Sequence, residues 1–233
     1  MLGQEPGDAM ALFRNRIEAG LELAKHLESY RGDPKAVILA IPRGGLVLGR
    51  VIAEKLRLDL DVILVKKIGH PVNPELAIGA VGLGAEHLDA DIIKKTEVPD
   101  SYVAARIRDI RRSLRSREEM YRSAKAPVPL LGKTAILTDD GVATGGTMLA
   151  AIWQARLRHP ARAVVATPVA SWSAFRLIAR GADQIVCPHV SEDFTAIGEF
   201  YEEFGAVSDA EALHLLARSH PPAVAFPTDK QAP

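Results

Sequence analysis

The sequence predicts an α/β fold: a doubly wound, mainly parallel sheet of about five strands with flanking helices. Short apolar runs rich in branched residues, typical of buried strands, alternate along the chain with segments of helical period. Alternation at this spacing favours parallel strands joined by helical crossovers. A chain of 233 residues, 48% hydrophobic and 25% charged, suits one well-cored domain, which we expect to span residues 1–218.

The first half of the chain begins with an amphipathic helix, because apolar residues recur at helical spacing from Phe13 to Leu27. AVILAIP (36–42) is a predicted strand, and a glycine turn and a helix to about Leu58 follow it. LDVILV (60–65) is the next strand. KKIGHPVNPE (66–75) has turn residues and no period, so we interpret it as a mobile loop. The last elements expected here are a pair of edge strands in AIGAVGLG (77–84) and a long helix over 100–122.

The second half repeats the alternation. The predicted strands are TAILTD (134–139), RAVVATPV (162–169) and DQIVCP (183–188). Three helices are expected: one from Thr147 to about His159, one that follows the second of these strands and runs through Ala179, and one over 208–218. Residues 189–205 are aromatic and acidic, without a clear strand or helix pattern. The segment 219–233 has four prolines and no apolar period, which indicates a disordered tail.

Composition excludes several classes of function. Lys plus Arg and Asp plus Glu are 29 each, so no global field favours nucleic acid or an anionic membrane. The N-terminus lacks a secretory pattern and no apolar stretch could span a bilayer, so we expect a cytoplasmic protein. Cys187 is the only cysteine, and no HExxH pattern occurs, so a metal held directly by a protein cage is not expected.

The most informative window is TAILTDDGVATGGTM (134–148), which places a glycine-rich loop between a predicted strand and a predicted helix. Backbone N–H groups and the partial positive charge of the helix N-terminus make such a loop an anion site. Gly145 and Gly146 allow close approach of the backbone, while Thr144 and Thr147 supply hydroxyl donors. The loop therefore predicts a phosphate site.

Asp139 and Asp140 precede that loop and cannot serve the phosphate directly. Carboxylates accept hydrogen bonds, so their natural partners in the same ligand are the vicinal hydroxyls of a sugar, or a Mg²⁺ ion that the ligand carries. A ribose 5-phosphate satisfies both halves of the window.

DDGVATGGT resembles the signature of the type I phosphoribosyltransferases. The resemblance implies that Asp139 and Asp140 hold the ribose hydroxyls of 5-phosphoribosyl-1-pyrophosphate (PRPP). It implies that Gly141 and the stretch Ala143–Thr147 form the loop around the 5-phosphate. Mg²⁺ is expected as the cofactor, arriving with the pyrophosphate and meeting the acidic pair only indirectly, through ligand or water.

Two further segments carry the resemblance. Pro42, Arg43 and Gly44 stand where that family has its pyrophosphate loop, and Lys66 and Lys67 open the segment at the place of its flexible catalytic loop. Over residues 10–217 the chain is similar to a bacterial "predicted phosphoribosyltransferase" group of unknown substrate. Ala143 stands where the hypoxanthine and guanine enzymes carry an aspartate, which disfavours that branch. In the family, base recognition comes from a hood of terminal segments, here about 1–30 and 189–217, where Phe194, Phe200 or Tyr201 could stack on a ring.

The implied reaction displaces pyrophosphate from the anomeric carbon. Arg43 and Lys67 would stabilise charge on the leaving group, Asp140 would act at the ribose, and Glu75 is the candidate general base. The acceptor would be a nitrogenous base or another small nitrogen nucleophile, and the resemblance implies a homodimer. A non-catalytic PRPP- or nucleotide-binding regulatory protein is the alternative, and a scaffold protein without a ligand is the third.

Overall fold

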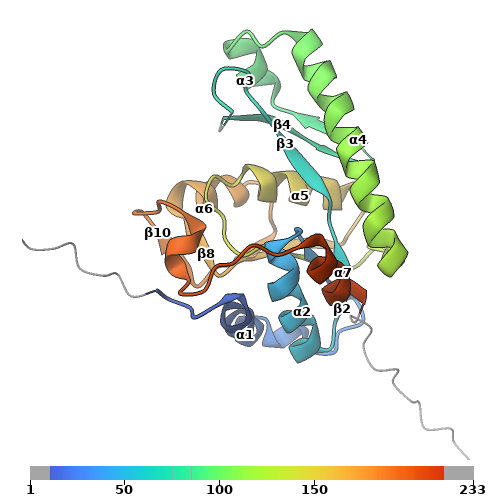
Figure 1. Ribbon diagram of the computed structural model, residues 1–233, viewed down its shortest axis with the longest axis vertical. Helices are drawn as coiled ribbons and strands as arrows, with labels where there is room; N and C mark the ends of the chain where they lie inside the picture. The colour runs from blue at the N-terminus through green and yellow to red at the C-terminus, as the bar shows by residue number, and fades with distance from the viewer. Residues whose placement is uncertain (1–10, 75, 85, 218–233) are drawn as a thin grey trace, which may run out of the picture.

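The computed structural model describes residues 11–74, 76–84 and 86–217, so the expected tail at 219–233 lies outside the described residues. At its centre is a sheet of five parallel strands, the kind of sheet that the sequence predicts, and their order is β2-β1-β6-β7-β9. Figure 1 shows how the helices surround it. The strands are β1 (Ala36–Ala40), β2 (Asp59–Val62), β6 (Thr134–Thr138), β7 (Arg162–Ala166) and β9 (Gln184–Val186). The predicted fold class is confirmed.

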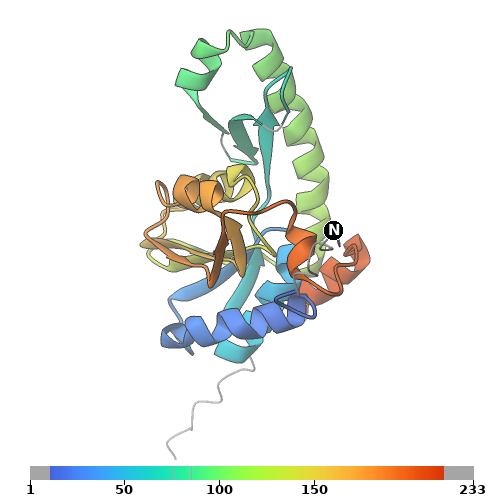
Figure 2. The same cartoon turned by 90° about the vertical axis from the view of Figure 1, so that its left-hand side faces the viewer.

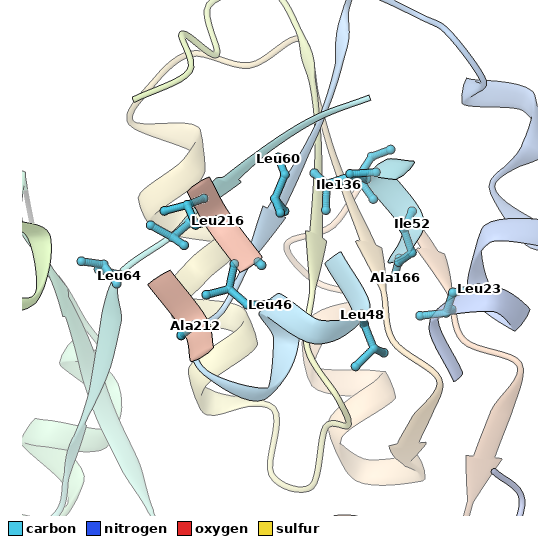
Figure 3. Packing of buried hydrophobic residues seen from close by; sticks show 14 of the residues in the cluster. Leu23, Leu46, Leu48, Ile52, Leu60, Leu64, Ile136, Ala166, Ala212 and Leu216 are labelled. Atoms are coloured by element: carbon cyan, nitrogen blue, oxygen red, sulfur yellow. The ribbon is translucent and has the colours of Figure 1, made fainter. Parts of the chain in front are cut away.

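Helices cover both faces of this sheet because successive strand side chains point to opposite sides. Ile38, Ile136 and Val164 pack with α1 (Arg16–His26), α2 (Gly44–Leu56) and α7 (Asp209–Ala217) in one cluster (Figure 3). Their neighbours in sequence, such as Val37 and Leu137, pack on the other face with α5 (Gly146–Arg156) and α6 (Trp172–Ile178). Both faces are apolar, which explains the continuous apolar runs in the sequence.

The segment between β2 and β6 forms a lobe above the central sheet (Figures 1 and 2). Its antiparallel sheet has the order β3-β4-β5, and the long helix α4 runs from it along one side of the molecule. The lobe consists of β3 (Val65–Gly69), β4 (Ala77–Gly82), β5 (Glu86–Leu88), α3 (Ala90–Lys95) and α4 (Asp100–Ala124). Helix α5 contacts both β3 and β4, which fixes the lobe against the central sheet.

Two predictions for this lobe are wrong. The interpretation of 66–75 as a loop fails for Lys66 to Gly69, which lie in β3 and pair with β4. Residues 77–82 form one strand, not a pair, and its second partner is β5. In both cases the hydrogen-bond partner is another strand of the lobe, which a local pattern does not identify.

The terminal segments meet beside the central sheet. Residues 189–205, which have no clear pattern in the sequence, contain β10 (His189–Ser191) and a short 3₁₀ helix, Ile197–Phe200. Strand β10 pairs in parallel with β8 (Val169–Ser171), while Phe13 forms an isolated bridge with Tyr201. A second 3₁₀ turn, Glu28–Tyr30, follows α1. Among the described helices, none has the length and apolar character needed to cross a membrane.

Candidate active site

The topology places one crevice at the carboxyl ends of β1 and β6. From β1 the chain passes through α2 to β2 on one side, and from β6 it passes through α5 to β7 on the other. Neighbouring strands whose connections leave in opposite directions form a switch point, where ligands bind in open α/β sheets. The two glycine segments singled out in the sequence follow these two strands.

The loop after β6 leads directly into the N-terminus of α5. Gly145 has φ +79° at the cap position, a left-handed conformation that favours glycine, and Gly146 begins the helix. Thr144 is exposed on the loop and Thr147 lies in the first turn of α5. The hydroxyl of Ser171 donates to the carbonyl of Ala143 at 2.6 Å, which ties the loop to the end of β8. This geometry fits an anion at the helix N-terminus.

The acidic pair stands at the start of the same loop. Asp139 is partly exposed, whereas Asp140 is 8% exposed, and the Asp140 N–H donates to Asp139 Oδ1 at 2.9 Å. Burial and the neighbouring Asp140 charge raise the pKa of Asp139 well above its usual value. Gly141, next in the chain, lies against the Ile197 side chain.

The loop after β1 brings the N-terminus of α2 to the acidic pair. The Pro42–Arg43 peptide bond is cis, and Gly44 is the first residue of α2. A Cβ on Gly44 would lie 2.0 Å from Asp140 Oδ2, so the carboxylate packs directly on the helix N-terminus. That end of the helix stabilises a negative charge.

The Arg43 side chain points elsewhere. Its Nη1 lies 3.6 Å from Asp209 Oδ1 of α7, and the side chain is 41% exposed. Such an exposed ion pair is weak, worth roughly 0–1 kcal/mol. Arg43 therefore contributes its backbone to the loop at the site, while its guanidinium lies outside the site.

The two lysines of β3 approach different parts of the site, because successive strand residues point to opposite faces. Lys66 lines a cavity of about 180 Å³ together with Pro42 and Arg117. The Lys67 side chain lies near Gly146, with its Cδ 3.9 Å from the position of a Cβ on that glycine. The candidate base Glu75 lies outside the described residues.

Sequence reasoning missed Arg16, whose Nε donates to Asp140 Oδ2 at 2.8 Å. No motif contains it, and its partner is 124 positions away, so only its place on the polar side of an amphipathic helix could have drawn attention. Tyr201 was expected as a possible ring platform. It is buried instead, with its hydroxyl donating to the Asp140 carbonyl at 2.6 Å and its ring beside Phe13 and Phe204.

Carboxylate oxygens are the ligands that Mg²⁺ prefers, and the acidic pair offers them beside an anion site. Over residues 11–74, 76–84 and 86–217, no group of three or more His, Cys, Asp or Glu residues could hold a metal ion. One Asp140 oxygen already contacts Arg16 and packs on Gly44. The acidic pair therefore fits a Mg²⁺ ion that a bound phosphate compound carries, with contact through that ligand or water.

Comparisons with known proteins identify the family of this chain. The family model described as "Phosphoribosyl transferase domain" matches residues 14–174, a segment that includes both glycine loops, the acidic pair and Arg16. Two Mycobacterium tuberculosis proteins, from strains CDC 1551 / Oshkosh and H37Rv, carry the names "Putative phosphoribosyl transferase" MT0597 and Rv0571c. Each is 36% identical over 212 residues, which is 91% of this chain and 48% of the relative. The chain thus spans about half the length of these curated relatives.

A solved structure, TT1426 from Thermus thermophilus, is similar over nearly its whole length. It has 39% sequence identity and a TM-score of 0.79, with 88% of this chain and 97% of that chain covered. The family match extends over more than half of the chain and includes the loops and carboxylates at the switch point. The protein therefore belongs to the phosphoribosyl transferase family.

Proposed function

We propose that the protein is a Mg²⁺-dependent phosphoribosyltransferase, which moves ribose 5-phosphate from PRPP to a nitrogenous base or another small nitrogen nucleophile. One observation carries this proposal: at a single switch point, the N-terminus of α2 packs on the Asp139–Asp140 pair, and the loop that begins with this pair leads into the N-terminus of α5. PRPP has two anionic groups separated by a sugar diol. The arrangement offers two anion sites separated by two hydrogen-bond acceptors.

Each part of the donor then has its own partner. The 5-phosphate lies at the N-terminus of α5, where the loop N–H groups and the Thr144 and Thr147 hydroxyls donate to it. Asp139 and Asp140 accept hydrogen bonds from the ribose hydroxyls. The pyrophosphate lies against the loop Pro42–Gly44, with Lys66 beside it.

In the proposed reaction, the bond from the anomeric carbon to the pyrophosphate oxygen breaks, and the acceptor nitrogen forms a new bond to that carbon. Positive charge develops on the ribose ring, close to the acidic pair, and negative charge develops on the pyrophosphate. Lys66, which lines the cavity at Pro42, and the backbone of the Arg43 loop stabilise the leaving group electrostatically. Lys67, expected in this role from the sequence, lies beside Gly146 and therefore nearer the 5-phosphate. Mg²⁺, when bound, neutralises part of the pyrophosphate charge. Glu75 remains the candidate that takes the acceptor proton.

Two features of the chain bear on the acceptor. Ala143 supplies no carboxylate beside the phosphate loop, which argues against acceptors of the hypoxanthine type. The hood segments remain the place to look for the base, with Phe194 and Phe200 as half-buried aromatic residues there, their ring centroids 4.9 Å apart. The proposal includes a homodimer located in the cytoplasm, which light scattering and cell fractionation test.

Isotope exchange tests the proposed function. The protein is incubated with PRPP, Mg²⁺ and radiolabelled pyrophosphate across a panel of bases, and label should enter PRPP when the correct base is present. The double variant Asp139→Asn with Asp140→Asn should lose both exchange and PRPP binding, while Asp91→Asn, an exposed acid on α3, should retain both. PRPP binding without exchange for any base would favour the regulatory alternative. No binding at all would favour a scaffold.

A further inference from the structure

Arg16 holds the Asp140 carboxylate from the far end of the chain. Its Nε donates to Asp140 Oδ2 at 2.8 Å, and each side chain is 12% exposed. Its Nη1 donates to the Gly205 carbonyl at 2.7 Å, and its guanidinium carbon lies 3.8 Å from the Phe204 ring centroid. Three partners in different directions fix the planar guanidinium, which a lysine could not match.

The segments that carry these groups are joined to each other. The Phe13 N–H donates to the Phe200 carbonyl at 3.0 Å, and the Glu202 N–H donates to the Phe13 carbonyl at 2.9 Å. Since the Tyr201 hydroxyl also reaches the Asp140 carbonyl, the two terminal segments contact Asp140 at both its carboxylate and its backbone. Arg16 is therefore part of a built arrangement and not an isolated surface charge.

A positive charge at this place has an electrostatic reason, because two carboxylates lie side by side. The Asp140 N–H donates to Asp139 Oδ1 at 2.9 Å, so the two side chains are neighbours at the start of the loop. Arg16 places a positive charge against this pair, and its bond to Asp140 Oδ2 opposes the repulsion between the two carboxylates.

Arg16 also leaves the exposed side of the pair open. The oxygen that it contacts, Asp140 Oδ2, is the one that packs on Gly44, whereas Asp139 remains partly exposed beside the phosphate loop. With this geometry, Arg16 supports the acidic pair and does not compete with a ligand for it.

We propose that Arg16 is a positioning residue for ribose recognition: it fixes the Asp140 carboxylate where the acidic pair can accept two hydroxyl hydrogen bonds. The inference rests on the proposed function, because it assigns one more residue to the same site. It also gives the hood a role at the sugar, in addition to any contact with the acceptor.

Calorimetric titration of the full chain with PRPP and Mg²⁺ tests the proposal. Arg16→Gln should weaken binding by roughly tenfold or more. Arg16→Lys should recover part of the affinity, because the charge remains while the Phe204 and Gly205 contacts are not all kept. Arg14→Gln is the matched control, since the Arg14 side chain forms a 3.3 Å ion pair with Glu203 between side chains that are 70% and 60% exposed. It should bind within about twofold of wild type.

Three results would overturn the proposal. Tighter binding by Arg16→Gln would mean that Arg16 competes with the sugar. Unchanged binding would mean that it has no role in recognition. A loss of binding with no recovery by Arg16→Lys and with a lower melting temperature would mean that it only supports the fold.

Failure of the proposed function gives a different result. Wild-type protein that does not bind PRPP would overturn that function, whatever the variants do. A crystal structure of Arg16→Gln, which needs no ligand, then decides the role of Arg16. The Asp140 carboxylate should leave its position against Gly44, and an unchanged carboxylate would overturn the inference.

Discussion

Gly44 and Asp140 are packed so closely that a single methyl group at position 44 would lie 2.0 Å from the carboxylate oxygen. The Asp140 carboxylate cannot move aside freely, because Arg16 donates a hydrogen bond to the same oxygen. We expect Gly44→Ala to displace the carboxylate at a cost of roughly 1–3 kcal/mol and to weaken PRPP binding by about tenfold or more. Gly84→Ala, where the nearest atom outside the chain neighbours is 3.6 Å away, is the control for calorimetric titration. Equal affinity of the two variants would contradict this prediction.

From the raised pKa of Asp139, we predict how the stability of the folded protein depends on pH. A carboxyl whose folded-state pKa lies above the unfolded value favours folding below the unfolded pKa, and this contribution is lost as the pH rises through the folded pKa. Asp139→Asn removes the ionised form, so it should raise the melting temperature at neutral pH and change it little at acidic pH, below the unfolded pKa. Each kcal/mol gained corresponds to roughly 2–4 °C. A lower melting temperature at neutral pH would show that the Asp139 charge stabilises the fold.

Asp61 should be important for stability without taking part in the site. Its carboxylate is fully buried, accepts from Arg122 Nη1 at 2.6 Å and accepts from the Val128 N–H at 3.0 Å. Asp61→Asn leaves Arg122 half-paired, so we expect a loss of about 3 kcal/mol in the free energy of unfolding, measured in urea. Asp183→Asn is the matched control: Asp183 also pairs with an arginine, Arg156, and with a backbone N–H, but its side chain is 38% exposed. It should cost about 1 kcal/mol or less, and similar losses in both variants would refute the role of burial.

Cys187 is expected to be unreactive in the folded protein. Burial raises the pKa of its thiol to about 12, and the S–H group donates to the His189 carbonyl at 3.4 Å. The thiolate is the reactive form, so a disulfide reagent at mildly alkaline pH should label Cys187 only after denaturant is added. Rapid labelling of the native protein would show that β9 and β10 open readily.

The central sheet and the acidic pair could be predicted because both depend on local sequence. Runs such as AVILA at β1 are apolar on both faces, and the DDGVATGGT window places carboxylates, glycines and a helix start within nine residues. The first strand of the lobe could not be predicted in the same way. Lys66 and Lys67 interrupt its apolar pattern, and β3 is stabilised by pairing with β4, a separate segment of the chain.

Side-chain pairs between segments far apart in the sequence could not be predicted either. Arg43 was expected at the pyrophosphate, but its guanidinium lies near Asp209, and the partner of Asp140 is Arg16. Neither pair has a motif, because each depends on where the terminal segments fold back onto the sheet. Only the three-dimensional arrangement identifies them.

The two lysines of β3 should act on different parts of the donor. Lys66 lines the cavity at Pro42, and the Lys67 side chain lies near Gly146 at the start of α5. We expect Lys66→Ala to weaken the binding of pyrophosphate and Lys67→Ala to weaken the binding of ribose 5-phosphate, each by roughly five- to tenfold, because one cation near an anion is worth about 1 kcal/mol or slightly more at a partly exposed site. Calorimetric titration with each ligand alone, in the presence of Mg²⁺, separates the two effects. Equal losses for both ligands in both variants would mean that the lysines contribute only a general positive charge. In that case the two faces of β3 would not serve separate anion sites.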